Sequence, residues 1–374
     1  MQFKISRENI LQPLLSISGV VEKRQTLPIL SHIFVEVLED SEDNKKLTLI
    51  GTDLEVEIKI SLSLDNVKEF GTTTIPARKF SDLTKALQDN SDMDIKVVNN
   101  RATIRSGKSR FTLSTLAADE YPRVEDISEV VRIEELTNAS LKNLLHKSQF
   151  CMAMQDVRYY LNGLLLEVEG DDIRFIATDG HRLAFCRKTL SNNYGDKKQV
   201  IIPRKAIHEL MRLLNDSDST VTIIMGKNHI QFILDTVTLT TKLIDGRFPD
   251  YDRVIPREGD RVLVTNNGSF KSAISRVSIL SNEKFRGIRM DMNESLVTIH
   301  ANNPEQEEAE EELSVKYIGE NMEIAFNSAY MMEALSVLDD EEVTIYFIDD
   351  KSSSLIHTEN KDEEYKLVIM PMRL

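Results

Sequence analysis

The pattern of apolar and polar residues along the chain switches repeatedly between two periods. In some stretches apolar residues recur three and four positions apart, as at Ile10, Leu14 and Ile17, which predicts amphipathic helices. Elsewhere they alternate with polar residues, as in residues 110–114, which predicts antiparallel strands. The helical stretches come in pairs, with one pair in each third of the chain.

The pattern therefore predicts six helices. Their buried faces are predicted to be Ile10, Leu14 and Ile17; Phe80, Leu83 and Leu87; Leu141, Leu144, Leu145 and Ser148; Ile207, Leu210, Met211 and Leu214; Phe270, Ala273, Ile274 and Val277; and Met331, Ala334, Leu335 and Leu338. Side-chain oxygens that accept from free backbone N–H groups favour the start of a helix. On that ground Ser6, Thr137 or Asn138, and Asn267 or Ser269 are predicted to cap the first helix of each pair.

Short motifs recur at a domain-sized spacing. The segment 74–79, which contains Pro76, is matched by 201–205, which contains Pro203, 127 positions later. Thr52-Asp53 recurs as Thr178-Asp179, and Tyr121-Pro122 recurs as Phe248-Pro249. A more diverged third copy places segments 324–327 and 368–371 at the corresponding points. Landmarks in one order at nearly constant spacing indicate a threefold internal repeat.

The repeat predicts three α+β domains, each with two helices packed against a curved antiparallel sheet. A chain of 374 residues is too long for one ordinary core, which agrees with this division. Turn-forming and charged residues gather near Asp126 and Pro256. We therefore predict domains at residues 1–125, 126–255 and 256–374.

The acidic charge is concentrated in the last third of the chain. The net charge is −15, and residues 255–374 contribute −12 of it, from 12 basic and 24 acidic side chains. Such asymmetry indicates a partner. The chain lacks an apolar run long enough to span a membrane, and its start lacks the apolar core of a signal peptide. We expect a cytoplasmic protein in which Cys151 and Cys186 are free and buried.

Several longer motifs resemble the bacterial sliding clamp, the beta subunit of DNA polymerase III. They lie at residues 155–163, 178–183, 245–251, 281–287, 302–308 and 370–374. The resemblance runs from Met1 to Leu374. It implies a head-to-tail homodimer whose six domains form a closed ring, with helices lining the hole. The implied function is a processivity factor for bacterial DNA replication that encircles duplex DNA and tethers the polymerase, the clamp loader and other proteins that bind clamps through short peptides.

The dimer contact is expected to join a basic cluster of the first domain to an acidic run of the third. The charged residues are Arg101, Arg105, Lys108, Arg110, Glu307, Glu308, Glu310 and Glu311, and the run continues to Glu312. By resemblance, Phe111, Ile279 and Leu280 supply the apolar centre. The alternative is that the acidic run is only a solvated face.

The DNA-binding residues implied by the resemblance are Arg24, Arg78, Gln155, Tyr159 and Tyr160. From the residues alone, Arg204, His208 and Arg212 share one side of a predicted helix, and Lys205 lies beside them. We therefore expect Arg204 and Lys205 to contact DNA as well. The alternatives are that these cations form ordinary solvated faces, and that one tyrosine packs in the core while the other lies at its rim.

The resemblance also implies a pocket for partner peptides. Its residues map onto Thr178, Gly180, His181, Arg182, Leu183, Pro249, Arg253, Val254, Asn327, Tyr330, Val368, Met370, Pro371, Met372 and Arg373. Leu183, Val254, Val368 and the methionines would form an adaptable apolar cleft. The arginines could hold polar or acidic groups of the peptide. The alternative is that the apolar C-terminal segment merely completes the last sheet.

Two other functions can be weighed from the residues. Asp179-Gly180-His181 would suit an oriented general base, but no nucleophile motif accompanies it. The Thr-Asp pair also occurs at Thr52-Asp53 without a histidine, which favours a structural turn in which Asp accepts from backbone donors. We expect no enzymatic activity and no cofactor. We also expect no metal site, because the seven histidines show no metal-ligand spacing. A monomeric repeat scaffold that only binds peptides is the alternative function.

Overall fold

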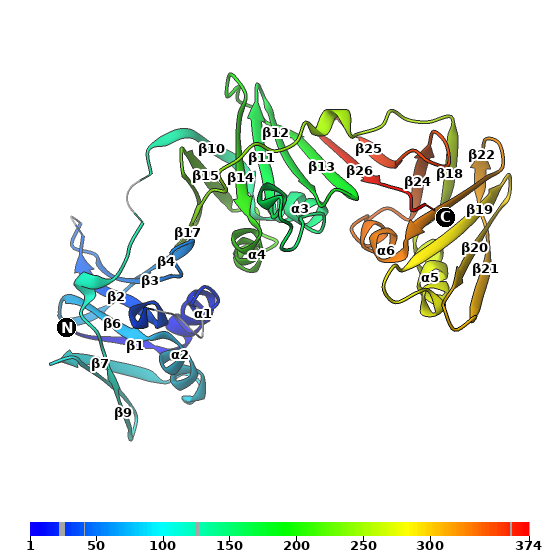
Figure 1. Ribbon diagram of the computed structural model, residues 1–374. Coiled ribbons are helices and arrows are strands. Elements are labelled where there is room, and N and C mark those ends of the chain that lie inside the picture. Colours follow the sequence, from blue (N-terminus) through cyan, green and yellow to red (C-terminus); the bar gives the residue numbers. More distant parts are fainter. Residues whose placement is uncertain (22–26, 41, 125–126, 360, 374) are drawn as a thin grey trace. The chain divides into compact units, whose positions relative to one another are not determined.

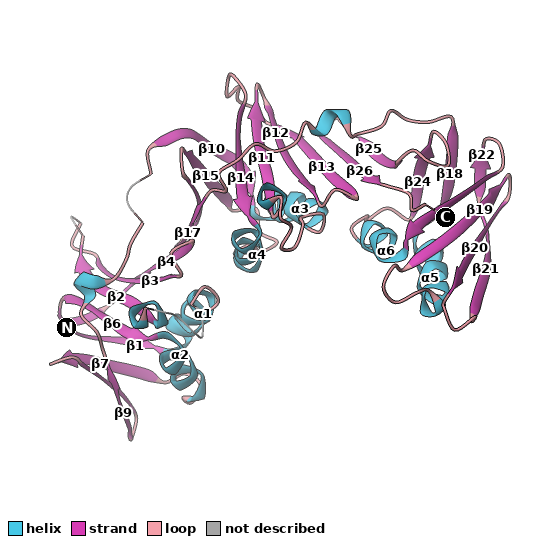
Figure 2. Cartoon of the chain, viewed as in Figure 1, coloured by secondary structure: helices cyan, strands magenta, loops and turns pink. Residues whose placement is uncertain are grey.

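The computed structural model describes residues 1–21, 27–40, 42–124, 127–359 and 361–373 (Figure 1). These residues form two compact units. The first unit contains Met1–Lys142 and Lys205–Leu243, and the second contains Asn143–Arg204 and Ile244–Leu374. Each unit is built from antiparallel sheets and helices (Figure 2).

The first unit holds a five-stranded and an eight-stranded sheet. The five-stranded sheet has the order β5 (Asn66–Glu69), β1 (Gln2–Ser6), β7 (Asp92–Val98), β8 (Arg101–Ser106), β9 (Ser109–Ser114). The eight-stranded sheet has the order β10 (Glu129–Thr137), β15 (Thr220–Gly226), β16 (His229–Leu234), β17 (Val237–Lys242), β4 (Val56–Ser63), β3 (Lys45–Thr52), β2 (His32–Glu39), β6 (Gly71–Pro76). Strands β17 and β4 come from different repeats, and buried Leu239 lies opposite buried Ile58 where they pair.

The second unit also holds two sheets. The nine-stranded sheet has the order β14 (Lys198–Pro203), β11 (Gly163–Glu169), β12 (Asp172–Thr178), β13 (Arg182–Thr189), β26 (Glu363–Ile369), β25 (Ser354–Glu359), β24 (Glu342–Phe347), β18 (Arg261–Asn266), β22 (Lys316–Ile318). The four-stranded sheet has the order β21 (Glu308–Ser314), β20 (Leu296–Asn302), β19 (Gly287–Asn293), β23 (Met322–Asn327). Strands β13 and β26 join the second repeat to the third, with Ala184 opposite Leu367.

Six α-helices lie in the described ranges, two for each repeat as predicted. They are α1 (Arg7–Ser18), α2 (Ala77–Ala86), α3 (Asn138–Gln149), α4 (Arg204–Leu213), α5 (Asn267–Val277) and α6 (Ser328–Ser336). Short 3-10 turns occupy Pro28–Ser31, Ala118–Glu120, Tyr159–Leu161, Tyr251–Arg253 and Ser278–Leu280. None of the helices formed by the described residues is both long and apolar enough to cross a membrane.

The predicted helix starts are correct for two of the three caps. Ser6 accepts a hydrogen bond from the Asn9 N–H, and Thr137 accepts one from the Ser140 N–H. The third cap is Asn266, whose Oδ1 accepts from the Ser269 N–H at 2.9 Å, so the prediction of Asn267 or Ser269 was wrong. The side chain of Asn267 instead turns inward and donates to the carbonyl of Leu335.

Helix α2 buries a different face from the one predicted. Phe80 is buried as expected, but Leu83 and Leu87 are only half-buried. Ser81 and Thr84 are buried instead, and Ser81 lies at the contact with α1. The Ser81 and Ser18 hydroxyls are 2.7 Å apart there, which supplies each buried oxygen with a partner.

The three-domain α+β prediction is confirmed, with one addition that the sequence did not indicate. Both large sheets continue from one repeat into the next, so the division into compact units cuts through the second repeat. The exact boundaries stay predictions. Asp126 lies outside the described residues, and Pro256 lies between the Tyr251–Arg253 turn and β18.

Candidate functional site

A tight turn between β12 and β13 forms the centre of the candidate pocket. The Asp179 carboxylate accepts from the backbone N–H groups of His181 and Arg182 at 2.9 and 3.0 Å. The Thr178 hydroxyl donates to the Arg182 carbonyl at 2.7 Å. Since its Oδ1 holds the turn, Asp179 has the structural role that the repeat predicted. In this turn His181 is exposed and Gly180 is half-buried.

The same turn occurs between β3 and β4 in the first unit. Asp53 Oδ1 accepts from the backbone N–H groups of Glu55 and Val56, and the Thr52 hydroxyl donates to the Val56 carbonyl. The two turns therefore share one hydrogen-bond pattern, which confirms that the Thr-Asp pair is a structural repeat.

Arg158 covers this turn, although the sequence analysis did not assign it to the pocket. Its guanidinium donates to the Asp179 carbonyl at 3.3 Å and is held in place by the Asp156 carboxylate. A Cβ atom at Gly180 would lie 2.9 Å from the nearest Arg158 nitrogen, so a larger residue there would require the Arg158 guanidinium to shift. The residue belongs to the 155–163 motif, and this was the available signal.

Arg182 lies beneath the surface of the pocket, and this corrects its expected role. The residue is only 8% exposed. Its guanidinium contacts the Glu333 and Asp179 carboxylates and donates to the Phe150 carbonyl. With these partners satisfied, Arg182 is placed to support the pocket rather than to hold acidic groups of a peptide.

The C-terminal segment contains several of the predicted pocket residues, and it lies beside the β12–β13 turn. Val368 lies opposite Leu183 in the nine-stranded sheet, and both are buried. After β26, the Met370 N–H donates to the His181 carbonyl, and the Met372 N–H donates to the Ala325 carbonyl. The segment therefore completes the sheet, as the alternative held, and then continues across the surface beside the turn.

The remaining pocket residues differ in how they are held. Val254 packs on the core cluster that contains Leu183 and Val368. Tyr330 stacks on His181, with ring centroids 6.2 Å apart. Asn327 caps α6 through its Oδ1. Pro249 and Arg253 are exposed, and Met372 and Arg373 also line a cavity of about 610 Å³ over β19, β20 and β21.

Some of the predicted DNA-binding residues are exposed, and others already have partners within the chain. Arg78 is largely exposed, with Asp82 nearby at 3.7 Å. Tyr159 is exposed, whereas Tyr160 packs against the core, which is the arrangement that the alternative described. Gln155 is exposed in a left-handed conformation with φ of 55°. Arg24 lies outside the described residues.

Arg204 and Lys205 are not free cations. The Arg204 guanidinium donates to the Met152 carbonyl at 2.6 Å, and burial lowers the pKa of this side chain. The Lys205 ammonium forms an ion pair with the buried Asp53 carboxylate. The expectation from spacing alone missed these partners because both of them are distant in the sequence.

The predicted dimer residues lie on two edge strands. In the first unit, β9 forms one edge of its sheet and exposes Arg110 beside half-buried Phe111. In the second unit, β21 forms one edge and exposes Glu308 and Glu310. Arg101, Arg105, Lys108 and Glu307 are also exposed, and Leu280 is half-buried. Ile279, which follows α5, is 77% exposed.

Glu311 differs from the other acidic residues of the run. Its carboxylate pairs with the Arg276 guanidinium of α5, and this hydrogen bond lowers the pKa of Glu311. Glu311 therefore has an ion-pair partner in its own chain, and the Glu310 carboxylate also lies 3.2 Å from the His300 Nδ1 atom.

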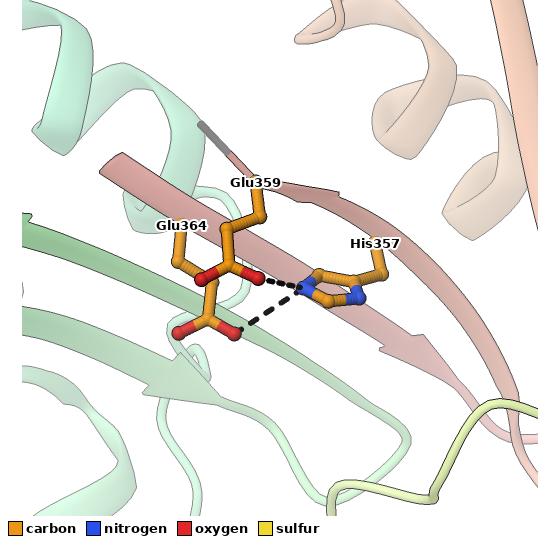
Figure 3. Close-up of side chains that lie close together, drawn as sticks. All are labelled: His357, Glu359 and Glu364. Carbon is orange, nitrogen blue, oxygen red and sulfur yellow. Dashed lines mark hydrogen bonds and ion pairs between the residues drawn. The ribbon is translucent and has the colours of Figure 1, made fainter. Parts of the chain in front are cut away.

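One group in the described part of the chain has the residue types of a metal site. His357, Glu359 and Glu364 lie together on β25 and β26 (Figure 3). Arg187 pairs with both carboxylates, and Lys366 pairs with Glu364. Because the chain's own cations already neutralise these acids, the cluster is best described as an ion-pair network.

The two cysteines are free and buried, as predicted. Burial raises the pKa of both the Cys151 and the Cys186 thiols, which disfavours the reactive thiolate.

Three protein-family profiles match the chain in order. The N-terminal, central and C-terminal domains of the DNA polymerase III beta subunit match residues 1–125, 135–250 and 252–373. Among curated relatives, the beta sliding clamp of Pseudomonas aeruginosa is 47% identical over 375 residues, and that of Escherichia coli K12 is 43% identical over 374 residues. Each alignment covers 100% of both proteins.

Solved structures agree with these matches. The crystal structure of the Pseudomonas aeruginosa DNA polymerase III beta subunit aligns with a TM-score of 0.94 over 100% of both chains, at 47% identity. A sliding clamp from Bartonella birtlesii bound to griselimycin aligns with a TM-score of 0.92 at 34% identity, again over 100% of both chains. This chain therefore belongs to the DNA polymerase III beta subunit family, the beta sliding clamps.

Proposed function

We propose that the chain is a processivity factor for DNA replication that acts as a ring-shaped homodimer in the bacterial cytoplasm. In this proposal the ring encircles duplex DNA and tethers the replicative polymerase, the clamp loader and other partners through the pocket around His181. The observation that carries the proposal is the pair of oppositely charged edge strands, β9 and β21, in a chain that belongs to the sliding clamp family.

The edge strands support a head-to-tail dimer. Each has one row of unpaired backbone groups, which is a template for pairing with another strand. Arg110 on β9 and Glu310 on β21 give the two edges complementary charge, which sets register and specificity. Two such contacts between two chains can close a ring.

The distribution of charge supports encirclement without tight binding. Many strong phosphate contacts would give salt-sensitive affinity and would resist sliding. Arg204 and Lys205 are held by partners in their own chain, which leaves fewer free cations than the sequence suggested. A closed ring is retained by topology, so a modest set of exposed residues such as Arg78 and Tyr159 suffices.

The pocket supports a binding role rather than an enzymatic one. The Asp179 carboxylate is occupied by backbone donors and by Arg182, so it is not free to orient His181 as a base. Relatives from Pseudomonas aeruginosa and Bartonella birtlesii have been solved with griselimycin bound. We propose that the same compound binds the pocket of this chain, where partner peptides would also bind.

The test is the solution mass of the purified chain together with negative-stain electron microscopy. We expect twice the chain mass of 42.7 kDa and ring-shaped particles with a hole wide enough for duplex DNA. A compact monomer at micromolar concentration would contradict encirclement and would favour the scaffold that only binds peptides.

A further inference from the structure

Arg182 connects two repeats beneath the candidate pocket. It lies at the start of β13, and its Nη1 atom is 2.6 Å from the Oε2 atom of Glu333 on α6. Its Nε atom is 3.1 Å from the Asp179 Oδ2 atom, and its Nη2 atom donates to the Phe150 carbonyl at 2.7 Å. All of these residues belong to the second unit.

The Arg182 guanidinium also supports an aromatic wall. It lies over the ring of Tyr330, 4.4 Å from the ring centroid, which is a favourable cation–π distance. Tyr330 in turn stacks on His181, with an angle of 25° between the ring planes. The contacts are therefore continuous: they run from Glu333 through Arg182 and Tyr330 to His181.

Within this series of contacts, Glu333 is the residue whose substitution would change the position of Arg182. It lies three residues after Tyr330, so both side chains occupy the same face of α6. The Asp179 carboxylate accepts from the backbone of its own turn, whereas Glu333 contacts the guanidinium from α6, the helix that also carries Tyr330. Without Glu333, the remaining carboxylate would draw Arg182 towards the β12–β13 turn.

We propose that Glu333 is a positioning residue for partner binding, which holds Arg182 under Tyr330 and so sets the aromatic wall of the pocket. This inference rests on the proposed function of the pocket. In this proposal the Arg182–Glu333 contact between the second and third repeats controls the shape of a binding surface to which both repeats contribute.

The experiment compares Glu333→Gln and Glu333→Ala with the wild-type chain, using griselimycin as the probe in calorimetric titrations. Glu320→Gln is the matched control, because it removes a carboxylate that pairs with an arginine, Arg261, elsewhere in the third repeat. We expect roughly three- to tenfold weaker binding for both Glu333 variants and unchanged binding for the control.

A spectroscopic readout separates positioning from a general loss of stability. The chain has nine tyrosines, so the 3-fluorotyrosine-labelled protein can be followed by fluorine NMR, with Tyr330→Phe to assign the Tyr330 signal. We expect Glu333→Gln to shift or broaden the Tyr330 signal in the protein without the probe, and Glu320→Gln to leave it in place.

The outcomes are distinct. If griselimycin binds the wild-type chain and the Glu333 variants equally, and the Tyr330 signal is unchanged, the positioning role is overturned while the proposed pocket stands. If the wild-type chain fails to bind griselimycin and its Tyr330 signal does not respond, the proposed pocket itself fails. If the Glu333 variants bind griselimycin more weakly than the wild-type chain and their Tyr330 signal is shifted, both the positioning role of Glu333 and the proposed pocket are supported.

Discussion

At the scale of single residues, the two Thr-Asp turns show which positions are set by the backbone and which by packing. Leu54 and Gly180 occupy the same place in their turns, and both have positive φ angles, 78° and 89°. The first turn therefore tolerates a leucine in the left-handed region. At the second turn a side chain would meet the Arg158 guanidinium in addition to the positive φ, so a substitution there would also displace Arg158.

Gly180→Ala should therefore disturb binding more than backbone strain explains. We expect a loss of about 1–2 kcal/mol in the free energy of unfolding and weaker griselimycin binding, because Arg158 must move. Gly195→Ala is the control, since Gly195 has a φ of 76° but open space around its Cβ position. Chemical denaturation and calorimetric titration give the two quantities. Equal binding by both variants would argue against Arg158 as part of the pocket.

His32 should give the first unit a stability that falls in mild acid. Burial lowers the pKa of this histidine from its ordinary value of 6.5, although the bond with Thr74 opposes the shift. The unfolded chain therefore binds a proton at a higher pH than the folded chain does. Stability from this group is complete above about pH 6.5 and is lost as the pH falls towards the lowered folded pKa.

Thermal unfolding of the wild-type chain and His32→Gln between pH 5 and 8 measures this effect. We expect the variant to be less stable at pH 8 but to lose less stability on acidification. Parallel curves for the two proteins would show that His32 does not carry this dependence.

Sequence patterns predicted some residue roles and missed others for identifiable reasons. The repeat of Thr-Asp revealed the turns, because their hydrogen bonds are local. Arg182 was assigned to a peptide contact, but its role depends on Glu333, which is 151 residues away along the chain. Lys205 and Asp53 are likewise far apart in the sequence, so neither the helical periodicity nor the spacing of the motifs predicted their ion pair.

At the scale of secondary-structure elements, the periodicity of apolar residues predicted the number and order of the helices. It did not predict which residue caps each helix. The start of α5 illustrates the difference. Adjacent asparagines compete for the cap, and tertiary contacts decide between them. Asn266 caps the helix, and Asn267 bonds to carbonyls at and beyond the end of α6. No local signal distinguishes the two side chains.

The two asparagines should therefore differ when each is replaced by alanine. Asn266→Ala removes an exposed cap and should cost about 1 kcal/mol. Asn267→Ala leaves buried carbonyls without their donor and should cost more, about 2–3 kcal/mol. Urea denaturation of both variants decides the order. The reverse order would show that capping, and not the α5–α6 contact, dominates this site.

At the scale of the whole molecule, complementary edges and an exposed apolar residue are the features that point to assembly. Ile279 is strongly exposed in the single chain and follows a helix beside the acidic edge strand β21. A large exposed aliphatic side chain near a charged edge is expected where a partner covers it. The strand alternation predicted a strand at residues 110–114 but none at the acidic run, and only the sheet orders show that β9 and β21 are terminal.

Ile279→Asp should convert the dimer to a monomer at micromolar concentration. A carboxylate there would be desolvated and would stand beside an already acidic strand. Val157→Asp is the control, because Val157 is even more exposed but belongs to the second repeat and to neither edge strand. Light scattering after size-exclusion chromatography gives the masses. A dimeric Ile279→Asp variant would place the contact elsewhere.

The shared sheets have a consequence for how the three repeats can diverge. Strand β17 of the second repeat pairs with β4 of the first, and β26 of the third repeat pairs with β13 of the second. A gene that lost one repeat would produce a protein in which a strand at the former junction, such as β4 or β13, has an unpaired edge. Such an edge invites aggregation. Copies joined in this way can differ in their surfaces, as the acidic third repeat does, but the loss of any one copy leaves its neighbour with an exposed strand edge.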